Sequence, residues 1–150
     1  PVDAGVAASA FGDIAALLDG GLGIHCCANT DWGFVLGLDP AVVSIDAWTY
    51  AHEFLLYADD IARYMERGGV VAWGIVPADH AAFAAENPDA FFSRFGEIRA
   101  RATETVDADL FDRQSLITPT CGIRNAFERE AIEIMAATAS LSRRLRGEEP

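Results

Sequence analysis

The sequence predicts an α/β protein in which helices alternate with the strands of a parallel sheet. Four short apolar segments are each followed by a stretch with helical spacing of apolar residues, and no hairpin turn separates one unit from the next. The run Val70–Val76 is continuously apolar and is bounded by Pro77, as expected of a strand buried on both faces. Such strands are joined by right-handed crossovers, so we expect all four to be parallel.

The expected elements follow from apolar spacing and from the residues that end helices. Glycine pairs and an Asp-Pro step close the helical stretches, at Gly20-Gly21, Asp39-Pro40 and Gly68-Gly69. We expect strands at residues 22–27, 42–46, 70–76 and 116–119. We expect helices at residues 8–19, 32–38, 51–67, 88–103 and 125–146. Together these elements predict a single domain over residues 1–150.

The charge composition excludes several classes of partner and mechanism. The 150 residues carry a formal net charge of −12. This charge would repel nucleic acids and anionic lipid surfaces, because binding to both begins with basic side chains that neutralise phosphates. All 11 basic residues are arginine. The chain therefore has no lysine for a Schiff base or for a phosphate-binding loop.

The apolar stretches and the cysteines favour a cytoplasmic location. The longest apolar stretches are interrupted well short of the roughly 18 residues that a membrane span needs, and the first residues lack the basic start of a signal peptide. The three cysteines are an odd number and two are adjacent, which makes a poor disulfide framework. In a reducing compartment such cysteines are typical of a metal or catalytic site.

Side chains that bind metals gather at the ends of the predicted strands. His25, Cys27, Asp46 and Cys121 lie at or just beyond strand ends, at the edge where parallel α/β proteins place their sites. Thiolate and imidazole are the ligands that zinc prefers. Residues two apart in a strand share a face, so His25 and Cys27 point the same way, while Cys26 is expected to be a core cysteine on the other face. The sequence therefore predicts a zinc site.

For several residues the sequence allows both a functional and a structural role. Asp46 either completes the zinc shell or caps the helix that follows it. His52 and His80 are expected to be exposed histidines without a role, rather than ligands or catalytic groups. The three tryptophans are expected to pack in the core rather than to stack on a ligand: Trp32, Trp48 and Trp73.

Three motifs resemble the metal motifs in the C-terminal barrel of cobalamin-independent methionine synthase. They are, in order, Gly23-Ile24-His25-Cys26-Cys27, Ser44-Ile45-Asp46 and Thr118-Pro119-Thr120-Cys121-Gly122. That family, with the related corrinoid methyltransferases and uroporphyrinogen decarboxylase, has a TIM-like (β/α)8 barrel, and the resemblance covers nearly the whole chain as about the last four βα units. It implies that His25, Cys27 and Cys121 are zinc ligands and that Asp46 takes the place of the usual fourth ligand, Glu.

The resemblance implies a zinc-dependent methyltransferase that activates a thiol acceptor, homocysteine or a similar thiol. In the family, zinc lowers the pKa of the acceptor thiol, and the thiolate attacks the methyl group of a folate or a corrinoid. At the end of the third strand the family carries a histidine that helps to protonate the folate leaving group, whereas this chain reads Trp73-Gly74-Ile75-Val76-Pro77. His80 lies just beyond and is the alternative candidate for that catalytic role, if it is not the exposed histidine without a role that is expected above. The missing histidine favours a corrinoid donor or an unidentified one.

Two other functions are compatible with the sequence. One is a non-catalytic zinc-binding half-barrel that works only in a larger assembly, with four protein ligands closing the site. The other is a metal-free, decarboxylase-like barrel.

The number of predicted strands indicates that the chain is part of an assembly. Eight strands close a TIM barrel, and the sequence provides four. We therefore expect either a C-terminal fragment that pairs with the N-terminal half of the barrel, or a homodimer in which two copies complete it.

Overall fold

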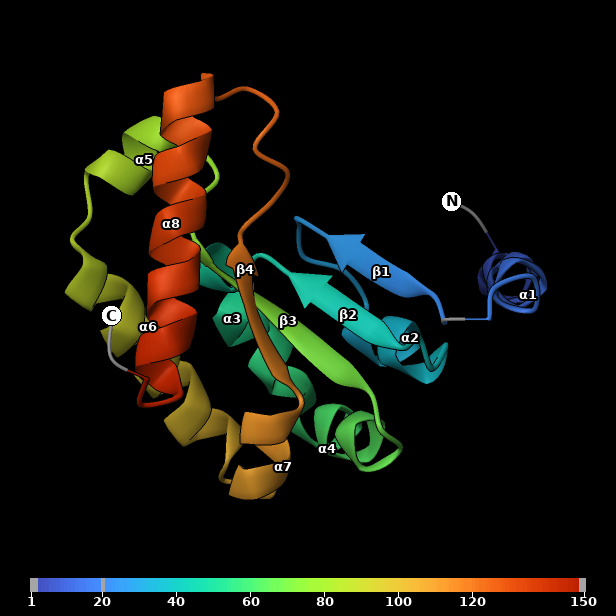
Figure 1. The fold of residues 1–150 in the computed structure, drawn as a ribbon. Coiled ribbons are helices and arrows are strands. Elements are labelled where there is room, and N and C mark those ends of the chain that lie inside the picture. Colours follow the sequence, from blue (N-terminus) through green and yellow to red (C-terminus); the bar gives the residue numbers. More distant parts are fainter. Residues whose placement is uncertain (1–2, 20, 149–150) are drawn as a thin grey trace.

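The protein is described by a computed structural model over residues 3–19 and 21–148. It contains a four-stranded sheet in which every pairing is parallel, in the order β1-β2-β3-β4 (Figure 1). The strands are β1 (Gly23–Cys26), β2 (Val42–Ile45), β3 (Val70–Val76) and β4 (Ser115–Pro119). The prediction of a parallel α/β sheet is confirmed, and each strand lies within one residue of its expected bounds.

The helices differ more from their expected bounds than the strands do. They are α1 (Ala4–Ala15), α2 (Trp32–Gly37), α3 (Ala47–Phe54), α4 (Ala58–Glu66), α5 (His80–Ala84), α6 (Pro88–Ala102), α7 (Ala108–Arg113) and α8 (Glu128–Leu145), with the 3₁₀ turn η1 (Leu55–Tyr57) between α3 and α4. The single helix expected at residues 51–67 is wrong, because α3, η1 and α4 share that stretch. Helices α5 and α7 lie where no element was expected. None of the helices in the described residues combines the length and the hydropathy that crossing a bilayer requires.

Short polar side chains begin most of these helices. Their N-cap residues accept hydrogen bonds from backbone N–H groups of the first turn: Asp3 on α1, Asp31 on α2, Asp46 on α3, Asp79 on α5, Asn87 on α6 and Asp107 on α7. Each such cap stabilises its helix by about 1 kcal/mol. Part of the strongly negative charge therefore has a structural role in starting helices.

Helix α1 lies apart from the body of the protein. The helix expected at residues 8–19 is wrong at both ends, because the Asp3 cap starts it at Ala4 and it ends at Ala15. Gly20, part of the expected stop, lies outside the described residues. None of the 12 residues of α1 is buried, and Figure 1 shows the helix beyond the β1 side of the sheet.

The core is rich in aromatic side chains that pack against one face of the sheet. Trp73 in β3 is fully buried, and its ring centroid lies 5.6 Å from that of Phe54 on α3 and 5.4 Å from that of Phe111 on α7. Its Nε1–H donates a hydrogen bond to Ser115 Oγ at 2.9 Å. Trp32 extends this cluster, with its ring 5.0 Å from Phe54. Trp32 and Trp73 are therefore core residues.

The opposite face of the sheet is less covered. The strand register places His25, Ser44, Ala72 and Leu116 in one row across β1 to β4, and alternation along each strand keeps them off the core face. His25 and Leu116, at the two ends of this row, are exposed. Strands β1 and β4 each have one edge that no other described strand pairs with. Both ends of this row therefore lie on edge strands.

Candidate metal centre

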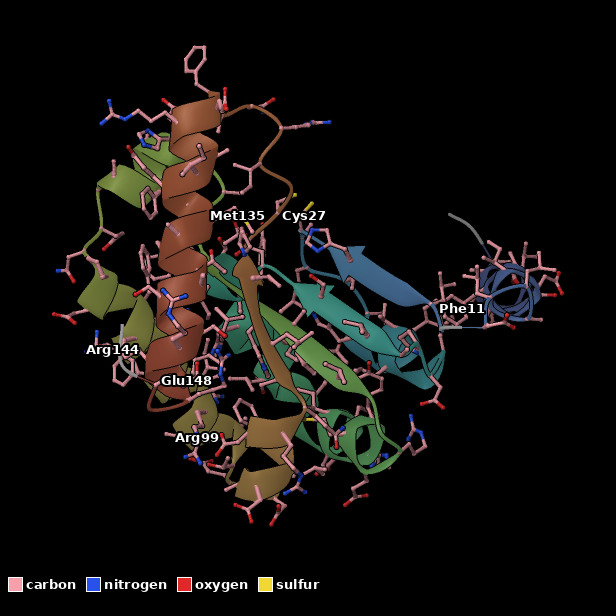
Figure 2. The ribbon with its side chains drawn as sticks, in the orientation of Figure 1. Phe11, Cys27, Arg99, Met135, Arg144 and Glu148 are labelled. Atoms are coloured by element: carbon pink, nitrogen blue, oxygen red, sulfur yellow. The ribbon has the colours of Figure 1, made fainter. Side chains whose placement is uncertain are left out.

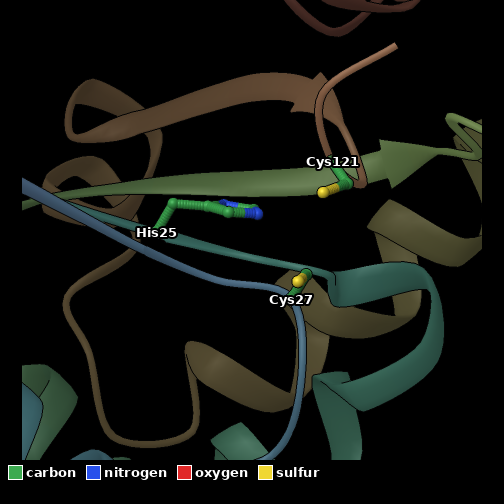
Figure 3. Close-up of side chains that lie close together, drawn as sticks. All are labelled: His25, Cys27 and Cys121. Carbon is green, nitrogen blue, oxygen red and sulfur yellow. The ribbon is translucent and has the colours of Figure 1, made fainter. Parts of the chain in front are cut away.

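Side chains from the first and the last strand of the sheet meet at its C-terminal edge. His25 is on β1, Cys27 follows β1 directly, and Cys121 comes two residues after the end of β4. One imidazole nitrogen and the two sulfur atoms all lie within 4.8 Å of one another. Figure 3 shows the His25 ring pointing toward the two thiols. Within residues 3–19 and 21–148, this is the one cluster of His, Cys, Asp or Glu side chains close enough to hold a metal ion.

His25 is oriented by a serine on the neighbouring strand. Its Nδ1 lies 2.9 Å from Ser44 Oγ, and the two residues are direct partners in the β1–β2 register. When Nδ1–H donates to this hydroxyl, the lone pair of Nε2 is free to bind a metal. The sequence motif includes Ser44, but a role for it becomes visible only when the register of the two strands is known.

The two adjacent cysteines have different surroundings, as strand alternation predicts. Cys27 is exposed beside His25, whereas Cys26 is half-buried and packs against the hydrophobic core (Figure 2 labels Cys27 at the sheet edge). The Cys26 thiol donates a hydrogen bond to the carbonyl oxygen of Ala28 at 3.1 Å. Cys26 is therefore separate from the cluster that Cys27 joins.

Cys121 is positioned by contacts of the residue before it. The Thr120 N–H donates to the carbonyl oxygen of Val76 at 2.8 Å, and Thr120 Oγ1 accepts a hydrogen bond from the Ala78 N–H at 3.0 Å. Thr120 is buried, so both bonds are shielded from water. They fix the exit of β4 against the exit of β3, and Cys121 follows at the surface.

The meeting of Cys27 and Cys121 requires a curved sheet edge. Two strands lie between β1 and β4, so three spacings of about 4.8 Å would put the ends of these strands roughly 14 Å apart in a flat sheet. The two sulfur atoms nevertheless lie within 4.8 Å. Figure 1 shows the sheet curling, with β4 crossing in front of β3. Curvature and the bends after β1 and β4 together bring the two thiols to one point.

The Cys121 side chain affects the ionisation of Cys27. The Cys121 side chain raises the pKa of Cys27 above its ordinary value, first through a hydrogen bond between the two and then through repulsion between their negative charges. Desolvation acts in the same direction as a smaller effect on the pKa. A cation between the two sulfurs would replace this repulsion with attraction.

Asp46 lies at the end of β2 and acts as a helix cap. Its carboxylate accepts a hydrogen bond from the Thr49 N–H at 2.9 Å at the start of α3. Asp46 is not part of the cluster formed by His25, Cys27 and Cys121. The structure therefore shows the capping role, and a role as fourth ligand stays a prediction.

His80 and His52 lie in different environments from the cluster. His80 Nδ1 lies 3.4 Å from Glu130 Oε1, and Nε2 lies 3.2 Å from Glu133 Oε2, so both ring nitrogens face carboxylates of α8. The hydrogen bond with His80 and a second with Arg129 lower the pKa of Glu133. His52 is exposed, with Nδ1 3.3 Å from Arg101 Nη1. His80 thus links α5 to α8, and its proposed catalytic role stays a prediction.

The site contains the three ligands that the sequence predicts, together with Ser44, whose contact with His25 the sequence does not predict. The structure brings His25, Cys27 and Cys121 together, keeps Asp46 on its helix, and adds Ser44. A comparison of the chain with models of protein families, with curated proteins and with solved structures found no match. The assignment of function therefore depends on the chemistry and geometry of this cluster.

Proposed function

We propose that the chain is a zinc-dependent, methionine synthase-like methyltransferase domain that activates a thiol acceptor such as homocysteine. The observation that carries this proposal is the convergence of His25, Cys27 and Cys121 at the C-terminal edge of a parallel sheet. The motifs around these residues resemble those of the family in order and spacing. The methyl donor would be a folate or a corrinoid protein. The location would be cytoplasmic, where thiols stay reduced.

The donor atoms of the cluster fit zinc. Two thiolates and one imidazole are ligands that zinc prefers, and with ordinary bond lengths they lie roughly 3.5–4 Å apart in a tetrahedral site. Atoms that lie within 4.8 Å reach this spacing when they approach by about 1 Å, a small movement for exposed side chains. Zinc held by these residues would lower the pKa of a thiol bound at the open position, so that the thiol reacts as a thiolate at neutral pH.

The described residues leave the candidate ligands open to a small thiol and hold them in a fixed orientation. All three candidate ligands are exposed, so a small thiol reaches them without any rearrangement of the core. Ser44 holds the His25 ring, and Thr120 anchors the strand end that carries Cys121. These contacts would keep one nitrogen and two sulfurs facing the same volume, which leaves one side of the site for the acceptor.

Replacing Ser44 with alanine tests the orienting contact. We expect Ser44→Ala to lower zinc affinity by about 10- to 100-fold, because a ligand histidine that loses its hydrogen-bond partner also loses its fixed tautomer and ring orientation. Competition with a chromophoric chelator measures the change. Thr49→Ala removes a hydroxyl near the same strand end and keeps the backbone N–H that Asp46 binds, so it is the control. Equal affinities of Ser44→Ala and the unaltered protein would contradict the role.

We further propose that the sheet is one half of a TIM-like (β/α)8 barrel. Its strands are arranged in chain order, as barrel strands are, whereas the order reverses within doubly wound open sheets. The convergence of thiols from β1 and β4 fits a curved barrel wall. Exposed Leu116 lies in the row that would line the interior.

An open half-barrel is expected to associate. Unpaired parallel edges and an inner face that is exposed at His25 and Leu116 favour pairing, either with a polypeptide that supplies the other half of the barrel or with a second copy of this chain. We expect sedimentation of the 150-residue chain to show dimers or larger species. A clean monomer that also binds no dye specific for exposed apolar surface would contradict the half-barrel.

The function is tested first by metal content and then by thiol binding. Protein purified without chelators is expected to contain one zinc per chain in elemental analysis. After replacement of zinc by cobalt(II), homocysteine is expected to change the visible spectrum, because a new thiolate would enter the coordination shell. Methionine, which has no thiol, is the control ligand.

Three outcomes separate the alternatives. One metal per chain with a homocysteine-dependent spectrum supports thiol activation. One metal per chain with a tetrahedral spectrum that no thiol changes indicates a closed, non-catalytic zinc site. Absence of metal contradicts the proposal and favours a decarboxylase-like use of the fold.

A further inference from the structure

We propose that Cys27 and Cys121 are a redox-active pair that forms a reversible intramolecular disulfide when the site holds no metal. The reactant is a low-molecular-weight disulfide such as oxidised glutathione. The disulfide itself requires no zinc. Its inhibition by zinc rests on the proposed function, because the same two thiols would then be metal ligands.

The two sulfur atoms are close together and can be reached from solvent. They lie within 4.8 Å of each other, and both cysteines are free and exposed. Because a disulfide bond is about 2.05 Å long, the sulfurs must approach by less than about 3 Å. Figure 3 shows the two side chains extending toward the same space from opposite sides.

The backbone around both cysteines can accommodate this approach. Cys26 is the last residue of β1, and Cys27 begins a bend. On the other side, Thr120 makes the last hydrogen bonds that hold β4 to β3, and residues 121–127 form a loop before α8. Neither cysteine is held in a strand ladder, so side-chain rotation and a small loop shift can close the gap.

Cys26 is the wrong partner for either thiol. It occupies the last strand position, and its side chain packs against the core on the face opposite to His25. Its thiol donates to the Ala28 carbonyl oxygen. To reach Cys121 it would have to leave the core and cross to the other face of the sheet, so the chain provides a built-in control cysteine.

The reaction is a pair of thiol–disulfide exchanges. The thiolate of one cysteine attacks a sulfur of oxidised glutathione, breaks its S–S bond and releases one glutathione thiolate. The thiolate of the other cysteine then attacks the protein sulfur of this mixed disulfide, forms the Cys27–Cys121 bond and releases the second glutathione. The two protein thiols lose two electrons and two protons in total, and oxidised glutathione takes them up as two molecules of reduced glutathione.

The disulfide would switch the metal site off. It removes both thiolates from the donor set and leaves His25 alone, which is insufficient to hold zinc. A metal bound by both sulfurs would in turn protect them from exchange. Reduction by excess thiol restores the pair.

Peptide mapping of metal-free protein tests the pairing. The protein is stripped with a chelator, incubated with oxidised glutathione and digested with trypsin without reduction. The first arginine is Arg63, so Cys26 and Cys27 share the peptide of residues 1–63, while Cys121 lies in the peptide of residues 114–124. We expect these two peptides to be linked in the unaltered protein and in Cys26→Ser, and to be unlinked in Cys27→Ser. Circular dichroism shows whether each variant is folded.

The outcomes distinguish this proposal from the function. No linked peptides in folded, metal-free protein, glutathione adducts alone, or a link that persists in Cys27→Ser would overturn the pair. Stoichiometric zinc is expected to slow the linkage by at least about tenfold. If linkage forms readily without zinc but at the same rate with it, the redox pair is supported and the zinc-ligand assignment fails.

Discussion

Replacing Cys27 or Cys121 with serine is expected to abolish stoichiometric zinc binding. Each substitution exchanges a thiolate for a neutral hydroxyl, which is a poor zinc ligand, and leaves two of the three clustered donors. Because changes to residues that only orient a ligand cost about 10- to 100-fold in affinity, loss of a ligand should cost more than roughly 100-fold. Chelator competition measures the affinity, and elemental analysis measures the metal retained after purification.

Cys26→Ser is the matched control for this experiment. It removes a thiol from the adjacent position, yet that thiol faces the core and hydrogen-bonds to Ala28. We expect its zinc affinity to stay within about threefold of the unaltered protein, since no donor is lost. Equal losses in Cys26→Ser and Cys27→Ser would refute the separation of the two side chains onto different faces.

The strands could be predicted closely from the sequence, while the helices could not. Strand segments such as Val70–Val76 are short, apolar and bounded by glycine or proline. Their first and last residues can therefore be predicted from the neighbouring sequence alone. The helix expected at residues 51–67 failed because its apolar stripe continues through the 3₁₀ turn at Leu55–Tyr57. Tyr50 has non-helical backbone angles within α3. An apolar stripe of this kind indicates which side of the segment faces the core. It does not indicate where the helical backbone is interrupted.

The metal cluster was predictable in part, for a similar reason. Alternation within one strand separates Cys26 from Cys27, and the parallel topology brings strand ends to one edge. The sequence does not identify Ser44 as a partner of His25, because that contact depends on the register between two strands. Helix α1 shows the same limit: its apolar stripe predicts a helix that packs on one side, yet none of its 12 residues is buried.

Replacing Gly74 with alanine is expected to disrupt both the sheet and the site. A Cβ atom at this position would lie 2.5 Å from the Ile45 carbonyl oxygen, 2.8 Å from Thr120 Cα and 3.1 Å from the Pro119 carbonyl oxygen. These are backbone atoms of both neighbouring strand ends, so no side chain can rotate away to make room. Overpacking of this kind costs about 1–3 kcal/mol of unfolding free energy. Denaturant unfolding measures the loss.

The same substitution should reach the metal cluster, because the atoms it displaces precede candidate site residues. Ile45 leads into Asp46, and Thr120 leads into Cys121. Gly96→Ala is the control: Gly96 lies in α6, a Cβ atom added there would meet nothing within 4 Å, and the change should stabilise the protein by about 0.5–1 kcal/mol. If Gly74→Ala weakens zinc binding while the protein remains folded, close approach of β3 to its neighbours is what sets the Cys121 position. Unchanged stability and zinc affinity would show that the strand ends can separate without cost, which would contradict the fixed strand exits from which the site is built.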